Sequence, residues 1–471
     1  MSYIDEYLED TEAYRDSIAT VDKEGKRIWL YPLPPKGPFH NKRMLATLVF
    51  LFVFFAGPWI KIQGQPLLMI NLFERKFVIF GQLFLPQDFI LFGLGMITFV
   101  IFIALFTVIY GRIWCGWLCP QTVFMEMIFR PIEQALEGSG RQQKKFDESP
   151  WTAEKVIRKS IKHLIFVLFS LLIAHVTMAY LIGIEEVIQL IQTSPLENPK
   201  GFAALLAFTA LFYFVFARLR EQVCIAICPY GRLQGVLVNP DTLTVIYDDV
   251  RGEPRGKYTK NVPIVEGHGD CVDCKLCVQV CPTGIDIRNG IQLECVNCTA
   301  CIDACDTVME KIDKPKGLIR YGSVKTVQEK LPFKFTNRAK AYSLILLALI
   351  GLEAYLLWSR SPVETTLLRV PGQLYQETGK GTLTNLYQVQ MVNKTHEDKW
   401  VTLILDEPKG ILRTIDGKTK FLIPSAGRAE VVFFIEIPEK DIKTRKTPIQ
   451  VSIKENEMLL ETHKSNFVGP I

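Results

Sequence analysis

Five long apolar stretches constrain this chain more than any other feature of its sequence. A helix needs about 20 mostly apolar residues to cross a bilayer, where its backbone polar groups must bond within the segment. The five stretches are Met44–Trp59, Phe89–Tyr110, His163–Ile184, Phe202–Ala217 and Ala341–Trp358. Core helices of a soluble protein are the alternative, but five such runs in one chain favour membrane spans. The sequence therefore predicts a multi-pass membrane protein with a bundle of transmembrane helices.

The distribution of Lys and Arg predicts which side of the membrane each segment faces. Seven precede the first span, nine lie between spans two and three, and eighteen lie between spans four and five, whereas the other two loops hold three and one. Loops rich in Lys and Arg stay in the cytoplasm. We therefore expect a cytoplasmic segment over 1–43, four spans over 44–217, a cytoplasmic segment over 218–340, a fifth span over 341–359 and a far-side domain over 360–471. The acidic, polar N-terminus is not expected to be a cleaved signal peptide.

The last part of the chain alternates apolar and polar residues in short runs, as strands with one buried face do. These runs are Tyr387–Val392, Trp400–Leu405, Ala429–Ile437 and Pro448–Ile453, with turn-forming residues between them. The pattern predicts a small antiparallel β-sandwich of immunoglobulin-like size, without the Cys and Trp markers of true immunoglobulin domains.

The twelve cysteines fall in four short clusters, and the last 166 residues contain none. A disulfide framework would scatter cysteines through the far-side domain, so this distribution indicates reduced thiols that bind metal. Two clusters follow each other with the same spacing, C-x2-C-x2-C-x3-C, and the first ends in CP. Such runs are typical of bacterial ferredoxins with two 4Fe-4S clusters, in which the fourth cysteine of each run binds the other cluster. The expected ligand sets are Cys271, Cys274, Cys277 and Cys305 for one cluster, and Cys295, Cys298, Cys301 and Cys281 for the other.

A pair of zinc sites is the alternative interpretation of these eight cysteines. Zinc ribbons use two CxxC pairs per ion, whereas here three cysteines share each tight run and a fourth follows after three residues. The spacing therefore favours iron-sulfur clusters. The second run departs from the ferredoxin pattern at Asp306, where proline is usual, which puts the local geometry in question rather than ligation.

The other two cysteine clusters are CxxxCP motifs at the cytoplasmic ends of the second and fourth spans. They contain Cys115, Cys119, Cys224 and Cys228. Residues four apart share one face of a helix, so each motif is expected to offer two sulfurs in one direction, and soft thiolates suit Cu(I), zinc or a cluster iron. Thiols that only pack are the alternative. The cations near these motifs are Arg112, Arg218, Arg220 and Arg232. They would favour the thiolate form of the cysteines, or they simply reflect the excess of Lys and Arg in cytoplasmic loops.

Other cofactors and ligands are not expected from the sequence. The histidines of the spans, His163 and His175, both lie on the third span, so facing helices offer no pair of haem ligands. There is no Walker loop, no dinucleotide fingerprint after a strand and no nucleophile elbow. The net charge of +5 is small for 471 residues and its basic residues flank the apolar runs, which argues against nucleic-acid binding. Electrons should therefore reach the chain from an unknown protein donor.

Taken together, WCGWLCP, CIAICPYGRLQ and CVDCKLCVQVCP, with five spans and a cysteine-free β-domain, resemble the CcoG/FixG/RdxA family of cytochrome c oxidase accessory proteins over nearly the whole chain. The resemblance implies a helical membrane bundle with an inserted two-cluster ferredoxin domain and a C-terminal immunoglobulin-like β-sandwich. It places the protein in a bacterial inner membrane, with the ferredoxin domain in the cytoplasm and the β-domain in the periplasm.

The resemblance also implies reduction of Cu(II) to Cu(I) during assembly of a cbb3-type oxidase. The protein would then be an assembly factor with cupric reductase activity. Copper would be its substrate, copper-trafficking and oxidase assembly proteins its partners, and Cys115, Cys119, Cys224 and Cys228 the candidates for copper contact or final electron delivery. Membrane lipid is expected around the spans, and homo-oligomer formation is left open.

Two other functions remain alternatives at this point. One is a quinol-linked electron donor to a partner reductase, since NapH-type and NosR-type proteins share the spans and clusters. The other is a non-catalytic scaffold for oxidase assembly, whose clusters stabilise the fold.

Overall fold

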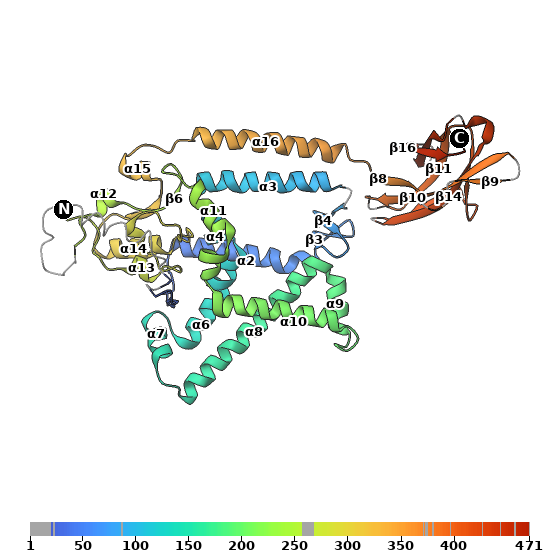
Figure 1. The fold of residues 1–471 in the computed structure, drawn as a ribbon. Helices are drawn as coiled ribbons and strands as arrows, with labels where there is room; N and C mark the ends of the chain where they lie inside the picture. Colours follow the sequence, from blue (N-terminus) through green and yellow to red (C-terminus); the bar gives the residue numbers. More distant parts are fainter. Residues whose placement is uncertain are drawn as a thin grey trace. The chain divides into compact units, whose positions relative to one another are not determined.

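The computed structural model describes residues 20–21, 24–85, 88–256, 268–370, 372, 375–378, 381–395, 397–425, 427–442, 444–455 and 458–470. Within these ranges, five helices are long and apolar enough to cross a membrane, which confirms the predicted spans. They are α2 (Pro38–Ala56) with its one-turn continuation η1 (Gly57–Trp59), α3 (Phe89–Tyr110), α8 (Ala153–Ile182), α10 (Pro199–Phe214) with the π-helical η4 (Val215–Leu219), and α16 (Asn337–Trp358). Figure 1 shows α2, α3, α10 and α16 with their axes roughly parallel.

The spans differ from the predicted ranges mainly at their first turns. Helix α8 begins ten residues before the predicted His163, because the Thr152 hydroxyl caps it by accepting the backbone N–H of Lys155. It ends at Ile182 rather than at Ile184, because Gly183 adopts a φ of 96° and a new helix, α9 (Ile184–Gln192), follows. Polar first turns and caps extend a helix beyond its apolar run, and hydropathy does not detect them.

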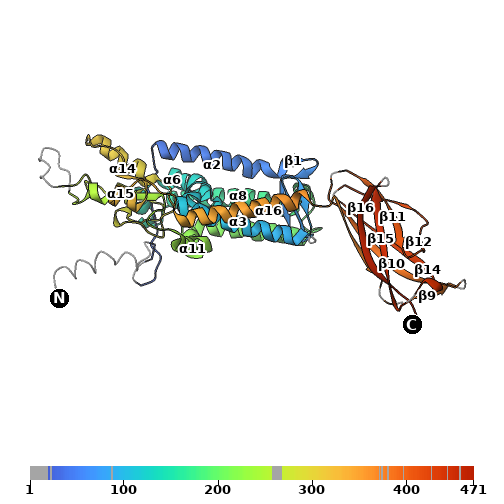
Figure 2. The same ribbon diagram turned by 90° about the horizontal axis from the view of Figure 1, so that it is seen from above.

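The chain divides into two compact units, which are described separately. The first consists of residues 1–58 and 93–351. Its ferredoxin segment pairs the antiparallel strands β6 (Thr244–Tyr247) and β7 (Ile319–Gly322) around short helical elements. These elements are α12 (Asp249–Gly252), α13 (Leu276–Gln279), η6 (Ile287–Asn289) and α14 (Ala300–Lys311). Figures 1 and 2 show them gathered at one end of the helices of this unit, where α14 contacts α2.

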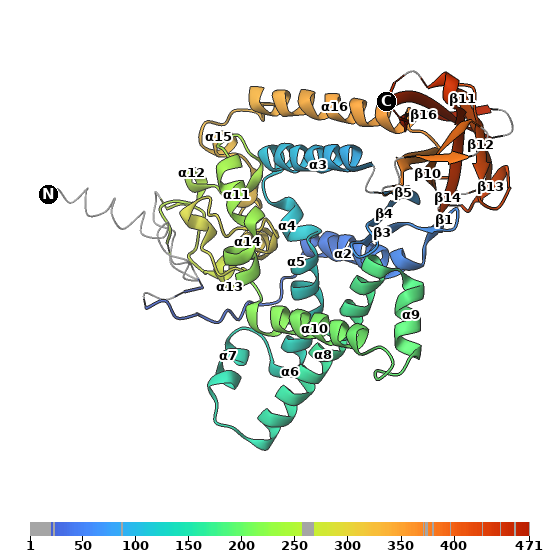
Figure 3. The same cartoon turned by 45° about the vertical axis from the view of Figure 1, so that its right-hand side comes forward.

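The second unit consists of residues 59–92 and 352–471. Its β-sandwich has one sheet of order β12-β14-β10-β8, with β9 also on β10, and one of order β13-β11-β15-β16, drawn in orange and red in Figure 3. The strands are β8 (Val363–Arg369), β9 (Gln376–Thr378), β10 (Thr382–Asn393), β11 (Lys399–Glu407), β12 (Ile411–Thr414), β13 (Lys420–Ile423), β14 (Arg428–Pro438), β15 (Lys446–Glu455) and β16 (Met458–Val468).

The inward-facing residues of these two sheets form one apolar core. Tyr387, Phe433 and Phe467 are its largest fully buried side chains, and the Tyr387 hydroxyl donates to the carbonyl of Asn466 on the facing sheet at 2.9 Å. Each of the four predicted runs lies inside a longer strand, β10, β11, β14 or β15. The fold class predicted from the sequence is confirmed.

The loop between the first two spans contains short strands that the sequence did not predict. They are β1 (Lys61–Ile62), β2 (Gln65–Pro66), β3 (Leu68–Asn71), β4 (Lys76–Ile79) and β5 (Gln82–Phe84). Within the second unit, Asp88 at the end of this loop forms ion pairs with Arg360 at 2.5 Å and Lys394 at 2.6 Å. The loop is thereby fastened to the β-sandwich.

Candidate functional site

The two ferredoxin cysteine runs fold into loops with the same backbone pattern. Asp273 and Lys275 of the first run have φ angles of 47° and 57°, and Asn297 and Thr299 occupy the equivalent positions of the second run with 53° and 65°. Asp and Asn enter this left-handed region readily, whereas a β-branched Thr rarely does. Alternating turns of this kind point successive backbone N–H groups into one concavity, which suits an anionic cluster. The loops therefore have a backbone shape that fits 4Fe-4S clusters.

The eight ferredoxin cysteines line two small cavities. One is lined by Cys271, Cys274, Cys277 and Cys305, together with Tyr247, Arg288 and Met309. The other is lined by Cys281, Cys295, Cys298 and Cys301, and also by Cys277. In each cavity the fourth cysteine comes from the opposite run. Each cavity therefore contains the four cysteines of one expected crossed set, and Cys277 lines both cavities.

Burial makes these thiols reluctant to ionise on their own. It raises the pKa of Cys277, Cys295 and Cys305 to about 12 and that of Cys298 to about 11. A metal ion that coordinates a thiol removes its proton outright. The donor set therefore fits a resident iron-sulfur group, whose positive irons would compensate the buried thiolates.

A single-ion zinc site fits the described side chains less well. A tetrahedral site with Zn–S bonds of about 2.3 Å needs sulfurs about 4 Å apart. Within the ranges that the structure describes, no group of three or more His, Cys, Asp and Glu side chains is arranged to hold one ion. The ferredoxin cysteines surround cavities rather than a point, which suits a group of several atoms.

Each CxxxCP motif folds as two helical segments joined at its second cysteine. Cys115 lies in α4 (Ile113–Trp117), whereas Cys119 is the residue before α5 (Pro120–Phe124) and has an extended backbone. Cys224 and Cys228 have the same relation to η5 (Val223–Ile227) and α11 (Pro229–Leu237). The expectation that each pair shares the face of one helix is therefore wrong. A residue that precedes proline avoids the helical region, which ends the first segment before its second cysteine.

The structure nevertheless brings the four CxxxCP thiols together. Burial raises the pKa of Cys115 to about 12; the charge of Arg112 opposes this, while Cys119, Cys224 and Cys228 are close enough to raise it further. Burial also raises the pKa of Cys224 to about 12, with contributions from Cys119 and Cys228. We call these four cysteines the thiol site.

The thiol site adjoins the second ferredoxin loop. Cys115 packs against the buried cluster formed by Val280, Val296, Cys298 and Ala300. A Cβ on Gly116 would lie 2.4 Å from the carbonyl oxygen of Val296, so this position admits only glycine without displacing the loop. The indole N–H of Trp117 also donates to the carbonyl of Asn297 at 3.3 Å. No role was expected for Gly116, although a glycine between two tryptophans of a cysteine motif is a signal of close backbone approach.

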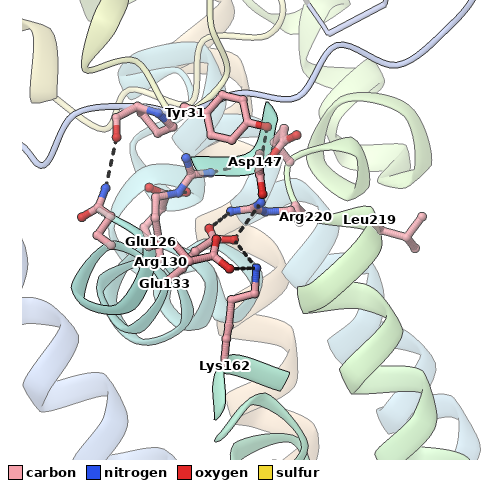
Figure 4. Close-up of polar contacts among 12 residues, drawn as sticks. Tyr31, Glu126, Arg130, Glu133, Asp147, Lys162, Leu219 and Arg220 are labelled. Carbon is pink, nitrogen blue, oxygen red and sulfur yellow. Dashed lines mark hydrogen bonds and ion pairs between the residues drawn. The ribbon is translucent and has the colours of Figure 1, made fainter. Parts of the chain in front are cut away.

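A buried ion network around Glu133, shown in Figure 4, is hydrogen-bonded to the segment that follows Cys119. Glu133 of α6 (Arg130–Glu137) pairs with Arg220, and at 3.3 Å with Lys162 of α8. The backbone carbonyl of Arg220 accepts the side-chain amide of Gln121, two residues after Cys119, at 3.1 Å. Burial alone would raise the pKa of Glu133, but the charges of Arg220, Lys162 and Arg130 outweigh it and hold the pKa at about 2.

The four arginines near the motifs have different surroundings. Arg220 is bound to Glu133 rather than to the thiols, Arg218 lies over the ring of Trp29 and Arg232 is exposed. Arg112 is the one of the four that ranks among the main charges acting on Cys115. The expectation that all four act on the thiols is therefore too broad.

The two histidines of the third span have protein partners. The Nδ1 atom of His175 lies 2.8 Å from the carbonyl of Leu171, one turn away. That of His163 lies 3.0 Å from the Tyr213 hydroxyl. Both contacts fit histidines satisfied within the helical bundle.

The spans, the paired cysteine loops and the ferredoxin fold define a multi-pass membrane iron-sulfur protein that transfers electrons. Family models agree with each part. A 4Fe-4S binding domain matches residues 92–137, a 4Fe-4S dicluster domain matches residues 219–324, and the immunoglobulin-like fold at the C-terminal of FixG matches residues 354–470.

Curated relatives cover most of the chain. Protein RdxA of Cereibacter sphaeroides is 32% identical over 417 residues, which cover 85% of this chain and 87% of the relative. Protein RdxB of the same organism is 31% identical and covers 83% and 85%, and the nitrogen fixation protein FixG of Rhizobium meliloti is 35% identical and covers 64% and 58%. The chain belongs to the FixG/RdxA family.

Proposed function

We propose that this protein passes single electrons from its ferredoxin domain to the thiol site, where they reduce Cu(II) to Cu(I) during maturation of a cbb3-type oxidase. The observation that carries the proposal is the direct packing of Cys115, in the thiol site, against the second ferredoxin loop around Cys298. In this proposal the crossed sets of cysteines hold two 4Fe-4S clusters, which store and release one electron each.

The chemistry of the thiol site favours copper as the electron acceptor. Thiolates are soft ligands that bind Cu(I) better than the harder Cu(II). Cu(II) reaching Cys115, Cys119, Cys224 and Cys228 accepts one electron and becomes Cu(I), and no bond to carbon forms or breaks.

The setting of this reaction rests on the family resemblance and on the charge distribution. Most of the Lys and Arg residues outside the spans and before the β-domain lie in the N-terminal segment, in the loop between spans two and three and in the segment between spans four and five. In this proposal the ferredoxin domain and the thiol site therefore lie on the cytoplasmic side and the β-domain in the periplasm. The β-domain is then available to copper-trafficking and oxidase assembly proteins, and a cytoplasmic donor reduces the ferredoxin domain.

A single-turnover experiment tests this proposal. Protein purified without oxygen is reduced by dithionite, freed of excess reductant and mixed with Cu(II) and a Cu(I)-specific chelator. We expect the EPR signal of the reduced protein to disappear as chelated Cu(I) forms, with one Cu(I) per electron lost. A variant with serine at Cys115, Cys119, Cys224 and Cys228 should keep its iron and sulfide but reduce Cu(II) at least about tenfold more slowly.

Three outcomes would contradict the proposal. Equal rates in the wild-type and serine variants would remove the thiol site from the reaction. Failure of wild-type protein to reduce Cu(II), together with fast reoxidation by an added quinone, would favour the quinol-linked function. A protein that neither copper nor quinone reoxidises would favour the assembly scaffold.

A further inference from the structure

Arg112 is a buried cation at the junction between the two redox parts of the protein. It is the residue immediately before α4, the helix that carries Cys115, and only 6% of its surface is exposed. Its guanidinium group donates to the backbone carbonyl of Gly231 in α11, the helix that follows Cys228. One side chain therefore ties the first CxxxCP motif to the second.

The neighbours of this guanidinium group make its burial unusual. The groups that act on it most strongly are the thiols of Cys115, Cys295 and Cys224 and the phenol of Tyr230. All four are neutral when protonated, and Arg112 makes no ion pair with any carboxylate in the described part of the chain. A buried charge without a counter-charge is strongly unfavourable. Ionised thiolates that bind a cluster or a metal would provide the missing negative charge on both sides of Arg112.

The first ferredoxin loop has an arginine in a contrasting setting. Arg288 also faces a cluster cysteine, Cys277, but it forms ion pairs of 2.6 Å with both Asp273 and Asp286. Its positive charge is therefore already balanced by two carboxylates. The charge of Arg112 is not balanced in this way.

The packing around Arg112 leaves little freedom to move this charge. A Cβ on Gly231 would lie 2.5 Å from the carbonyl of Cys224 and 3.5 Å from Nη2 of Arg112. The backbone of the second motif and the guanidinium group of Arg112 are thus in close contact. The bond to Gly231 fixes the charge within electrostatic reach of Cys295 in the second ferredoxin loop and of Cys115 and Cys224 in the thiol site.

We propose that Arg112 is a positioning residue that links the second ferredoxin loop and the thiol site electrostatically and draws the electron towards the thiol site. An added electron makes a cluster more negative, and a fixed cation beside one of its ligands stabilises that reduced state. Arg112 acts on both the second ferredoxin loop and the thiol site. It therefore lowers the free energy of a cluster electron that is held next to the thiol site. The inference rests on the proposed function only for the direction of electron flow, because its effect on the cluster needs no copper.

Redox titration followed by EPR tests this role without copper. The wild-type protein should show two one-electron steps. Arg112→Gln should move one step to a more negative potential, and Arg112→Lys, which keeps the charge, should restore most of the shift. Arg288→Gln should move the other step, and Arg232→Gln, which removes an exposed charge from α11, should move neither.

Iron and sulfide content measured on each variant shows whether both clusters are present. If Arg112→Gln loses clusters, its redox potentials cannot be compared with those of the wild type. The inference then requires that Arg112→Lys shows both redox steps at potentials close to those of the wild type. The inference is overturned if Arg112→Gln, with full iron and sulfide, leaves both steps unchanged or moves both equally. It is also overturned if Arg112→Lys shifts the step as far as Arg112→Gln does. Either result leaves the copper experiment described above unaffected.

Discussion

Replacing Glu133 by glutamine tests whether the buried ion network holds the second CxxxCP segment in place. Glu133 is 5% exposed and pairs with Arg220 and Lys162, which are also buried. Glutamine keeps the size of the side chain but removes its charge. Arg220 then loses its ion pair, which fixes the chain four residues before Cys224. Lys162 loses one of its two carboxylate partners and keeps Glu137 at 2.7 Å.

The lowered pKa of Glu133 and the usual cost of breaking a buried ion pair indicate a similar loss of stability. A pKa lowered from its ordinary 4.5 to about 2 corresponds to about 3 kcal/mol of stabilisation by the ionised form. Removing one partner of a buried ion pair costs about 3–5 kcal/mol in proteins generally. We expect Glu133→Gln to lower the free energy of unfolding by about 3 kcal/mol at neutral pH.

The sign of the pH dependence follows from the lowered pKa of Glu133. Its stabilising effect is complete above its ordinary value of 4.5 and is lost only as the pH falls towards about 2. The difference between wild type and Glu133→Gln should therefore stay constant between about pH 5 and pH 8.

Unfolding in mixed micelles, followed by circular dichroism during an SDS titration, measures this difference. Glu154→Gln is the matched control, because Glu154 pairs with Arg158 on the surface with side chains 68% and 47% exposed; it should change stability by less than about 0.5 kcal/mol. A double variant of Glu133 and Arg220 should show a coupling of at least about 1 kcal/mol. Equal stability of wild type and Glu133→Gln, or additive effects in the double variant, would refute the reasoning.

Three further predictions follow from the cysteine loops and their contacts. Cys305→Ser and Cys281→Ser should each remove about half of the iron and sulfide, but different redox steps should disappear from the two titrations; loss of the same step would contradict the crossed sets. Gly116→Ala should slow copper reduction at least about tenfold because its Cβ would strike the loop at Val296, whereas Gly93→Ala, which meets nothing within 4 Å, should not. Alkaline phosphatase fused after the β-domain should be active in cells, since we propose that this domain is periplasmic; an inactive, stably expressed fusion would reverse the orientation.

The features that were predictable from the sequence are those that depend on the pattern of a few neighbouring residues. Hydropathy alone located the span Phe89–Tyr110 to the residue, and period-two alternation located β10, β11, β14 and β15. The cysteine spacing predicted the grouping of Cys281 with the second run and Cys305 with the first, because a three-residue gap places the fourth cysteine away from its own loop. In these cases each signal is confined to a few neighbouring residues.

The features that were missed depend on short elements or distant contacts. Strands β1 to β5 contain two to four residues each, too few to show a period. The helical face expected for Cys115 and Cys119 fails because proline acts on the residue before it, an effect that outweighs the four-residue spacing. Glu133, Lys162 and Arg220 come from three separate segments, and in sequence they cannot be told from ordinary charges of membrane loops.

Arg112 and Gly116 show where the sequence holds a signal that only the structure interprets. Both lie within five residues of Cys115. From the sequence alone, Arg112 fits the excess of basic residues in cytoplasmic loops and Gly116 fits a simple turn. The structure adds the close approach of Gly116 to Val296 and the hydrogen bond from Arg112 to Gly231.

Iron and acid-labile sulfide, measured with EPR on protein isolated without oxygen, test the central claim most directly. The account predicts about eight irons and eight sulfides per chain, and a reduced spectrum from two 4Fe-4S clusters. Colourless protein without sulfide, or with zinc in place of iron, would contradict the assignment of the cysteine loops and the electron transfer that depends on them.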